Sequence, residues 1–306
     1  MENKDKIRNL VENKFSVTRI ADDLNQGFIH IKIKKDGVQG IGSSLSVGVA
    51  IDKAYHEYCE RKILRSINLP NSNGMAAHFN QKLSAESSTS ELIERDVFLT
   101  SWLSETGPYW LTDLQRDIYS KLSTSFLKQI RKLNIGFRIG VAGVCNDRHV
   151  TIGVLTDEGF RKPFGMILAT ASGKDIGQAI DKITMDLNRT LSVYIQDSSE
   201  CSLKDPIALT KPINHLQYYL NPESLDGLDW FFEGNSQILK LKDIEIQVEE
   251  LRSFEKYPLW DPVVSVAKSN NAQEYFTGLS IDHINLDRFY ENQLSPIGLK
   301  HVHPLG

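Results

Sequence analysis

Residues 84–102 read SAESSTSELIERDVFLTSW and have the pattern of an amphipathic helix. This stretch carries Glu91, Glu94 and Arg95 in the spacing Glu-x-x-Glu-Arg, and the same spacing occurs earlier as EYCER at residues 57–61, inside a second helical pattern. Side chains three or four positions apart share one face of a helix. We therefore expect each of two helices to present two carboxylates and one guanidinium group on the same side.

Two interpretations of this doubled motif are open. If the helices pack facing each other, they offer four carboxylates as oxygen ligands for Mg²⁺, with guanidinium groups beside them for the phosphates of a nucleotide. Alternatively, a glutamate and an arginine four positions apart form a common surface pair, worth about 0.3–0.5 kcal/mol. The repetition of the motif in matching apolar surroundings favours the metal site.

The composition is that of an ordinary globular protein. The chain has 306 residues, of which 41% are hydrophobic and 24% charged, so it can bury a sizeable core. The formal net charge of −4 argues against an extended basic surface, and we therefore expect no nucleic-acid partner.

Cysteine content and the N-terminus bear on the compartment. The three cysteines, Cys59, Cys145 and Cys201, are far apart and form no Cys-x-x-Cys motif, so we expect neither a disulfide framework nor a thiolate zinc site. Residues 1–15 are too charged for a signal peptide, and no apolar run approaches the roughly 18 residues that span a bilayer. These features predict a cytoplasmic protein without a membrane segment.

Strand and helix patterns alternate along the chain and predict an α+β fold with mixed and antiparallel sheets. Asp36-Gly37 is typical of a hairpin turn between two short strands, and three later apolar runs indicate an antiparallel meander. The expected meander strands are residues 137–145, 150–156 and 164–170, and the expected helices are 46–69, 84–102, 112–133 and 172–193. No linker divides the chain, so we expect a single domain over residues 1–306, with 1–27 as an N-terminal helical extension.

A short internal similarity links the two halves of the sequence. Residues 48–53 read GVAIDK and residues 177–182 read GQAIDK, each at the start of an expected helix. Such a similarity also arises by chance in amphipathic helices. We interpret these two helices as structural equivalents.

Other catalytic signatures are weak. The glycine-rich stretch at residues 40–44, GIGSS, lacks the lysine of a P-loop and the third glycine of a dinucleotide fingerprint. His301 and His303 offer two imidazoles without further ligands, which is more typical of a surface tail. His56 and His78 flank the motifs and are candidate proton carriers, although a helical histidine is more often packed or solvated.

The loop and helix around the second motif resemble the core signature of the YcaO superfamily. The matching segments are SNGMAA at residues 72–77 and SELIERDVF at residues 90–98, and the helix that holds EYCER resembles the family's first motif. Looser similarities are Pro212, His215, residues 218–222 and residues 303–304. The resemblance is strongest over residues 40–103 and implies a layered YcaO-like architecture.

The resemblance implies an activity and a set of ligands. Relatives bind ATP and Mg²⁺ without a P-loop and phosphorylate a peptide amide oxygen, so that cysteine, serine or threonine side chains close into azolines, while other members form thioamides or amidines. The implied magnesium ligands are Glu57, Glu60, Glu91 and Glu94. The implied nucleotide contacts are Arg95, Arg61, Lys53, Ser72 and Arg189.

Departures from the family pattern keep a second function open. Lys53 stands where a serine is usual and is expected to contact phosphate itself, Ala76 replaces a hydroxyl residue, and Leu83 replaces a carboxylate. The alternative is therefore a catalytically inactive scaffold or peptide-presenting subunit. In either case the implied partners are a precursor peptide of ribosomal origin, such as a bacteriocin precursor, a separate peptide-recognition protein and a flavin-dependent dehydrogenase.

Overall fold

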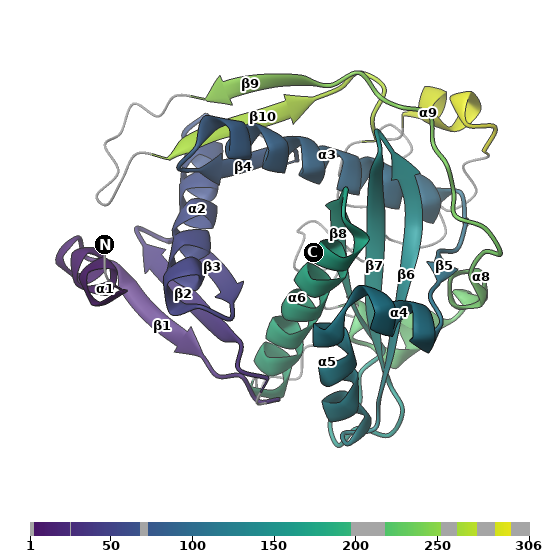
Figure 1. Cartoon of the computed structure of the whole chain (residues 1–306), viewed down its shortest axis with the longest axis horizontal. Helices are drawn as coiled ribbons and strands as arrows, with labels where there is room; N and C mark the ends of the chain where they lie inside the picture. The colour runs from purple at the N-terminus through teal and green to yellow at the C-terminus, as the bar shows by residue number, and fades with distance from the viewer. Residues whose placement is uncertain are drawn as a thin grey trace. The chain divides into compact units, whose positions relative to one another are not determined.

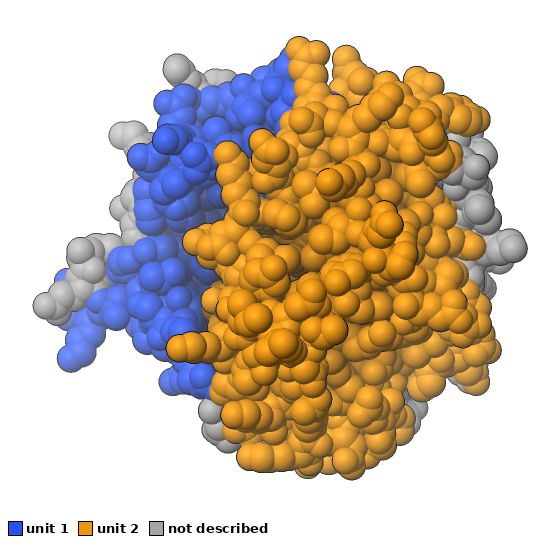
Figure 2. Space-filling view, turned by 45° about the vertical axis from the view of Figure 1, so that its right-hand side comes forward, with its two compact units in different colours: residues 1–92, 246–269 blue, residues 93–245, 270–306 orange. Residues whose placement is uncertain are grey.

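The computed structural model describes residues 3–24, 26–67, 73–196, 218–251, 262–273 and 285–294. It combines helices with antiparallel sheets, which confirms the predicted α+β class (Figure 1). The chain forms two compact units, shown in different colours in Figure 2: unit 1 holds residues 1–92 and 246–269, and unit 2 holds residues 93–245 and 270–306. Each unit is assembled from separated stretches of sequence. The single domain over residues 1–306 stays a prediction.

Unit 1 contains two three-stranded sheets, with strand orders β1-β2-β3 and β4-β10-β9. Every pair of neighbouring strands in them is antiparallel. Its elements are α1 (Asn3–Glu12), β1 (Ser16–Ile20), β2 (Ile29–Lys35), β3 (Val38–Ser44), α2 (Val47–Ser66), β4 (Met75–His78), β9 (Gln247–Leu251) and β10 (Val263–Lys268). Helix α3 (Gln81–Leu103) begins in unit 1 and ends in unit 2.

The N-terminal part of unit 1 follows the sequence expectations with one addition. Asp36 and Gly37 adopt φ angles of 50° and 74°, as the predicted hairpin turn between β2 and β3 requires. Residues 1–27, expected as a helical extension, hold α1 but also β1, which pairs with β2. The β-branched side chains in the β1 sequence SVTRI favour this strand.

Strand β3 lies unusually close to helix α2, and its glycines make that possible. A Cβ atom at Gly40 would lie 2.0 Å from the carbonyl oxygen of Ala54, and one at Gly42 would lie 2.0 Å from that of Ala50. Both distances are far below van der Waals contact. The GIGSS stretch is therefore a strand that packs against a helix backbone, which explains its glycines without a phosphate loop.

Unit 2 is built on a four-stranded antiparallel sheet in the order β5-β6-β7-β8. This sheet contains the predicted meander as three consecutive strands. The elements of unit 2 are β5 (Tyr109–Trp110), α4 (Asp113–Tyr119), α5 (Lys121–Arg131), β6 (Ile135–Cys145), β7 (Arg148–Asp157), β8 (Met166–Gly173), α6 (Ile176–Gln196), η2 (Pro222–Leu225), α8 (Asp229–Glu233) and α9 (Leu286–Glu291). No helix among the described residues has the length and apolar character needed to cross a membrane.

The prediction of one helix over residues 112–133 was wrong, because the chain forms α4 and α5 with a break at Ser120. Ser120 adopts an extended backbone, with φ −148° and ψ 112°. Its hydroxyl oxygen accepts a hydrogen bond from the backbone N–H of Ser123 and so caps the N-terminus of α5. The same hydroxyl donates to Asp181 of α6 at 2.5 Å, a contact that the local sequence does not reveal.

The two units repeat one arrangement of elements. In unit 1 the order is α1-β1-β2-β3-α2 and in unit 2 it is α5-β6-β7-β8-α6, and in each case the final helix packs on the last two strands (Figure 1). The GxAIDK similarity falls at the start of α2 and α6. Its aspartates play similar parts, since Asp52 pairs with Lys6 of α1 at 2.6 Å and Asp181 accepts from Ser120 at the start of α5. This supports the interpretation of α2 and α6 as equivalents.

We predict that Gly42→Ala lowers the free energy of unfolding by about 1–3 kcal/mol, because the new methyl group forces β3 away from α2. Urea unfolding followed by circular dichroism measures this loss. Gln39→Ala is the matched control, since Gln39 lies on the same strand, is half-buried and should change the stability by less than about 0.5 kcal/mol. Equal stability of Gly42→Ala and wild type would contradict the close-packing interpretation.

Candidate functional site

Charged side chains along α2 satisfy backbone groups of β3, an edge strand of its sheet. Every fourth residue of the helix meets every second residue of the strand, because a helical turn and two strand residues have similar lengths. The contacts are Lys53 Nζ to Ser43 O at 3.1 Å, Ile41 N to Glu57 Oε2 at 2.6 Å, Arg61 Nη1 to Gln39 O at 3.3 Å, and Arg65 Nη2 to Gly37 O at 3.1 Å. Three predicted site residues, Lys53, Glu57 and Arg61, therefore also have a structural role.

Within the first motif, Glu57 and Arg61 form the expected pair one helical turn apart. Glu57 Oε1 lies 2.5 Å from Arg61 Nη2. Both side chains remain partly exposed, at 29% for Glu57 and 42% for Arg61. A partly exposed ion pair of this kind can exchange partners, so it does not prevent either residue from binding a ligand.

Glu60 is a carboxylate of the predicted site in unit 1 whose ionised form is disfavoured by its surroundings. Its Oε1 accepts a hydrogen bond from the backbone N–H of Ala77 on β4 at 2.7 Å. Burial and repulsion from Glu91 and Glu57 raise the pKa of Glu60 well above its usual value, although the Ala77 hydrogen bond and Arg61 oppose the rise. A cation bound here would relieve the repulsion, so the donor set fits Mg²⁺, which prefers carboxylate oxygens.

Glu94, in unit 2, is buried and has partners that the sequence did not reveal. The hydroxyl of Thr170 on β8 donates to Glu94 Oε1 at 2.6 Å, and Lys182 Nζ on α6 lies 3.5 Å from Oε2. Burial alone would raise the pKa of Glu94, but Lys182, Arg95 and the Thr170 hydrogen bond together lower it. Glu94 is therefore held as a carboxylate, the form that binds a metal ion.

Sequence reasoning missed Lys182, although a signal for it existed. Lys182 ends the GQAIDK similarity and corresponds to Lys53 at the end of GVAIDK. Because α2 and α6 occupy equivalent positions in the two repeats, each repeat contributes one lysine from the same turn of its last helix. Treating the similarity as a functional repeat would have added Lys182 to the candidate cations.

Two of the predicted metal ligands have basic partners in the structure. In the part of the chain that the structure describes, no group of three or more histidine, cysteine, aspartate or glutamate side chains is placed to hold an ion. Glu57 and Glu94 instead face Arg61 and Lys182. Binding a metal ion would require these carboxylates to turn from their basic partners.

The remaining predicted residues occupy varied surroundings. Arg189 pairs with Asp186 on the same helix at 3.1 Å, and Arg95 is half-buried on α3. Leu83 lies near the start of α3 with 43% of its surface exposed, while Ala76 is buried in β4. The positions outside the described residues are Ser72, Pro212, His215, His301 and His303.

His56 and His78 lie together in unit 1, with ring centroids 5.0 Å apart. Burial, and to a lesser extent the neighbouring His78 and Lys6, lower the pKa of His56 to about 4. His56 is therefore neutral at physiological pH. This makes it a poor proton donor, which weakens the hypothesis that it carries protons.

Several solved structures share this fold. The YcaO protein from Methanopyrus kandleri bound with AMPPCP and Mg²⁺ is 12% identical in sequence to this chain. The alignment covers 90% of this chain and 92% of the M. kandleri chain, with a TM-score of 0.61. The E. coli microcin synthetase McbBCD complex is 11% identical over 84% of this chain and 88% of its own, with a TM-score of 0.61. A heterocyclase in complex with substrate and cofactor is 10% identical over 89% of this chain and 52% of its own, with a TM-score of 0.64.

The sequence itself supplies the family. A family model described as YcaO cyclodehydratase, ATP- and Mg²⁺-binding, matches residues 41–257, and no curated protein sequence matches the chain. The match covers more than half of the 306 residues. The chain belongs to the YcaO family, whose ligands are ATP and Mg²⁺.

We predict that Glu60→Gln stabilises the metal-free protein at neutral and alkaline pH, by on the order of 1 kcal/mol. The raised pKa means that the stability contribution of Glu60 is present below the usual glutamate pKa and is lost as the pH rises through the raised value. The glutamine keeps an oxygen for the Ala77 N–H but carries no charge. Urea unfolding in EDTA between pH 5 and pH 9 measures the difference.

Glu86→Gln is the control for this experiment, because Glu86 lies on α3 with 52% of its side chain exposed. It should leave the pH dependence of stability unchanged. Adding Mg²⁺ should stabilise the wild type more than Glu60→Gln. If the stability of Glu60→Gln depended on pH in the same way as that of the wild type, the result would contradict the repulsion at Glu60 that we describe.

Proposed function

We propose that this protein uses ATP and Mg²⁺ to activate a backbone amide of a peptide, most simply for cyclodehydration of cysteine, serine or threonine residues to azolines. The observation that carries the proposal is the repulsion of Glu60 by Glu91 and Glu57, at a carboxylate held by the backbone N–H of Ala77, in a chain of the YcaO family. Thioamide or amidine formation requires the same amide activation and differs in the attacking group.

In this proposal Glu57, Glu60, Glu91 and Glu94 hold Mg²⁺. The cationic and hydroxyl side chains that contact the nucleotide phosphates are Arg61, Arg95, Lys53, Lys182, Arg189 and Ser72. Lys182 joins the set because of its contact with Glu94. Such residues act by positioning and by neutralising charge rather than by covalent chemistry.

The reaction needs a better leaving group than an amide oxygen. ATP supplies it, because transfer of the γ-phosphoryl group to the amide oxygen lets that oxygen depart as phosphate after the side-chain heteroatom attacks the carbonyl carbon. The protein must hold the peptide carbonyl against the phosphoryl group and exclude water from it. We propose that a separate protein presents the precursor peptide, that a flavin-dependent dehydrogenase can oxidise the product, and that the complex acts in the cytoplasm.

A second candidate function is a scaffold that keeps the fold without turnover. Leu83 favours it, because an exposed leucine replaces a carboxylate of the family pattern near the start of α3. Buried Ala76 favours it as well, since it offers no hydroxyl group. Lys182 and the ion-binding chemistry of the four glutamates favour the enzyme.

Glu94→Gln should weaken the binding of Mg²⁺ with AMPPCP by at least about 10–100-fold, which is the usual effect of losing only an outer-shell partner of a metal site. The glutamine can still accept from Thr170 but loses the negative charge. Isothermal titration calorimetry gives the affinity, and Glu86→Gln on the same helix should bind as the wild type does.

Phosphate release from Mg²⁺·ATP in the presence of precursor peptide and partner protein separates the two functions. The proposed enzyme releases phosphate and Glu94→Gln does not. Activity retained in Glu94→Gln would refute the metal role of Glu94. A wild type that releases no phosphate with all partners present would establish the scaffold.

A further inference from the structure

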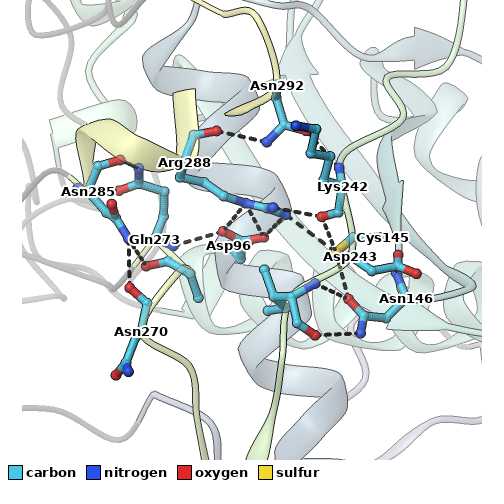
Figure 3. A network of polar contacts seen from close by, with 12 residues as sticks. Asp96, Cys145, Asn146, Lys242, Asp243, Asn270, Gln273, Asn285, Arg288 and Asn292 are labelled. Carbon is cyan, nitrogen blue, oxygen red and sulfur yellow. Dashed lines mark hydrogen bonds and ion pairs between the residues drawn. The ribbon is translucent and has the colours of Figure 1, made fainter. Parts of the chain in front are cut away.

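A buried ion pair joins helix α3 to helix α9 in unit 2 (Figure 3). Asp96 and Arg288 are both 0% exposed. The guanidinium group of Arg288 makes a bidentate contact with the Asp96 carboxylate: Nη2 lies 2.6 Å from Oδ2, and Nε lies 3.1 Å from each of Oδ1 and Oδ2. This geometry fixes both the distance and the orientation of the two side chains.

Further hydrogen bonds hold both members of the pair. Arg288 Nη1 donates to the carbonyl oxygen of Lys242 at 2.7 Å, and Nη2 lies 3.4 Å from Cys145 Sγ. Asp96 Oδ1 accepts from the backbone N–H of Gln273 at 2.8 Å. A pair held from so many directions has little freedom to rotate.

Neighbouring amides extend the network to the adjacent chain segments. The side chain of Gln273 donates to the carbonyl oxygen of Asn285 at 2.5 Å and accepts from its N–H at 3.1 Å. The side chain of Asn146 likewise donates to Ile244 O and accepts from Ile244 N, both at 2.9 Å. Figure 3 shows these segments gathered around Asp96.

The position of the network along the chain is informative. The chain passes from one unit to the other after Leu92, Glu245 and Ser269. Each of these crossing points has a residue of the network within four positions of it, namely Asp96, Ile244 and Gln273 respectively. All members of the network belong to unit 2. One set of hydrogen bonds therefore fixes the unit 2 end of every passage.

Asp96 also lies next to two predicted site residues, Glu94 and Arg95. Successive helix positions are about 100° apart, so Asp96 and Glu94 project to different sides of α3. Clamping Asp96 therefore fixes the rotation of this part of α3 and with it the direction of Glu94. Stability alone gives little reason for such a pair, since apolar side chains often replace a buried ion pair without loss.

We propose that Asp96 and Arg288 are positioning residues that set the rotation of α3 so that Glu94 and Arg95 meet Mg²⁺ and the nucleotide phosphates. This inference rests on the proposed function. Arg288 acts through Asp96 and touches no ligand itself. Helix α9 thus contributes to the site through a contact between residues 192 positions apart in sequence.

The test compares the full-length wild type with the double variant Asp96→Leu/Arg288→Met, which replaces the pair by apolar side chains and leaves no unpaired buried charge. The unfolding temperature should fall, because the backbone N–H of Gln273 and the carbonyl oxygen of Lys242 lose their partners, but the variant should remain folded at the temperature of the binding measurement. The affinity for Mg²⁺ with AMPPCP, measured by calorimetry, should fall at least tenfold. Arg116→Met is the matched control, because Arg116 is a buried, ion-paired arginine of the same unit and should keep wild-type affinity.

A folded double variant with wild-type affinity would overturn the inference. Arg288→Lys is a second test variant, because lysine keeps the positive charge but cannot contact the Asp96 carboxylate through two nitrogens. It tests the inference even if the double variant does not fold. Its affinity should also fall severalfold, and an unchanged value would overturn the inference. A wild type that does not bind Mg²⁺ with AMPPCP would instead refute the proposed function, and the inference with it.

Discussion

Repulsion of the Glu60 carboxylate by neighbouring acids is the interaction on which the proposed metal site depends. Glu60 is brought near Glu91 and Glu57, and its pKa rises because burial and like charge both disfavour the ionised form. A fold keeps such an arrangement at a cost in stability, which a bound cation can offset. The backbone N–H of Ala77 donates to Glu60 and so holds its carboxylate near the other two acids despite the repulsion.

The scaffold around these acids is a sheet edge covered by a helix. Gly40 and Gly42 let α2 approach β3, and the charged side chains of α2 then complete the hydrogen bonding of the strand. In the second repeat α6 packs on β8, and Lys182 of α6 meets the carboxylate of Glu94. The two equivalent lysines of the repeat thus have different partners: Lys53 donates to the carbonyl oxygen of Ser43, and Lys182 meets the carboxylate of Glu94.

Local sequence patterns predicted those features of the structure that are determined by residues close together in the sequence. The Asp36-Gly37 turn, the meander and the spacing of Glu91 and Glu94 follow from periodicity and turn chemistry. Contacts between distant segments were not predictable: Thr170 reaches Glu94 across 76 residues, and Arg288 reaches Asp96 across 192. The break at Ser120 belongs with them, because Asp181 favours it from another helix.

The most direct test of a carboxylate site for Mg²⁺ and triphosphate is anomalous X-ray diffraction from crystals grown with Mn²⁺ and AMPPCP, since Mn²⁺ takes the same oxygen ligands as Mg²⁺ and scatters anomalously. We predict a peak in the anomalous difference map that marks an Mn²⁺ ion coordinated by the carboxylates of Glu60 and Glu91 and by phosphate oxygens of the nucleotide. Nucleotide bound elsewhere, or a peak without these carboxylates, would contradict the account.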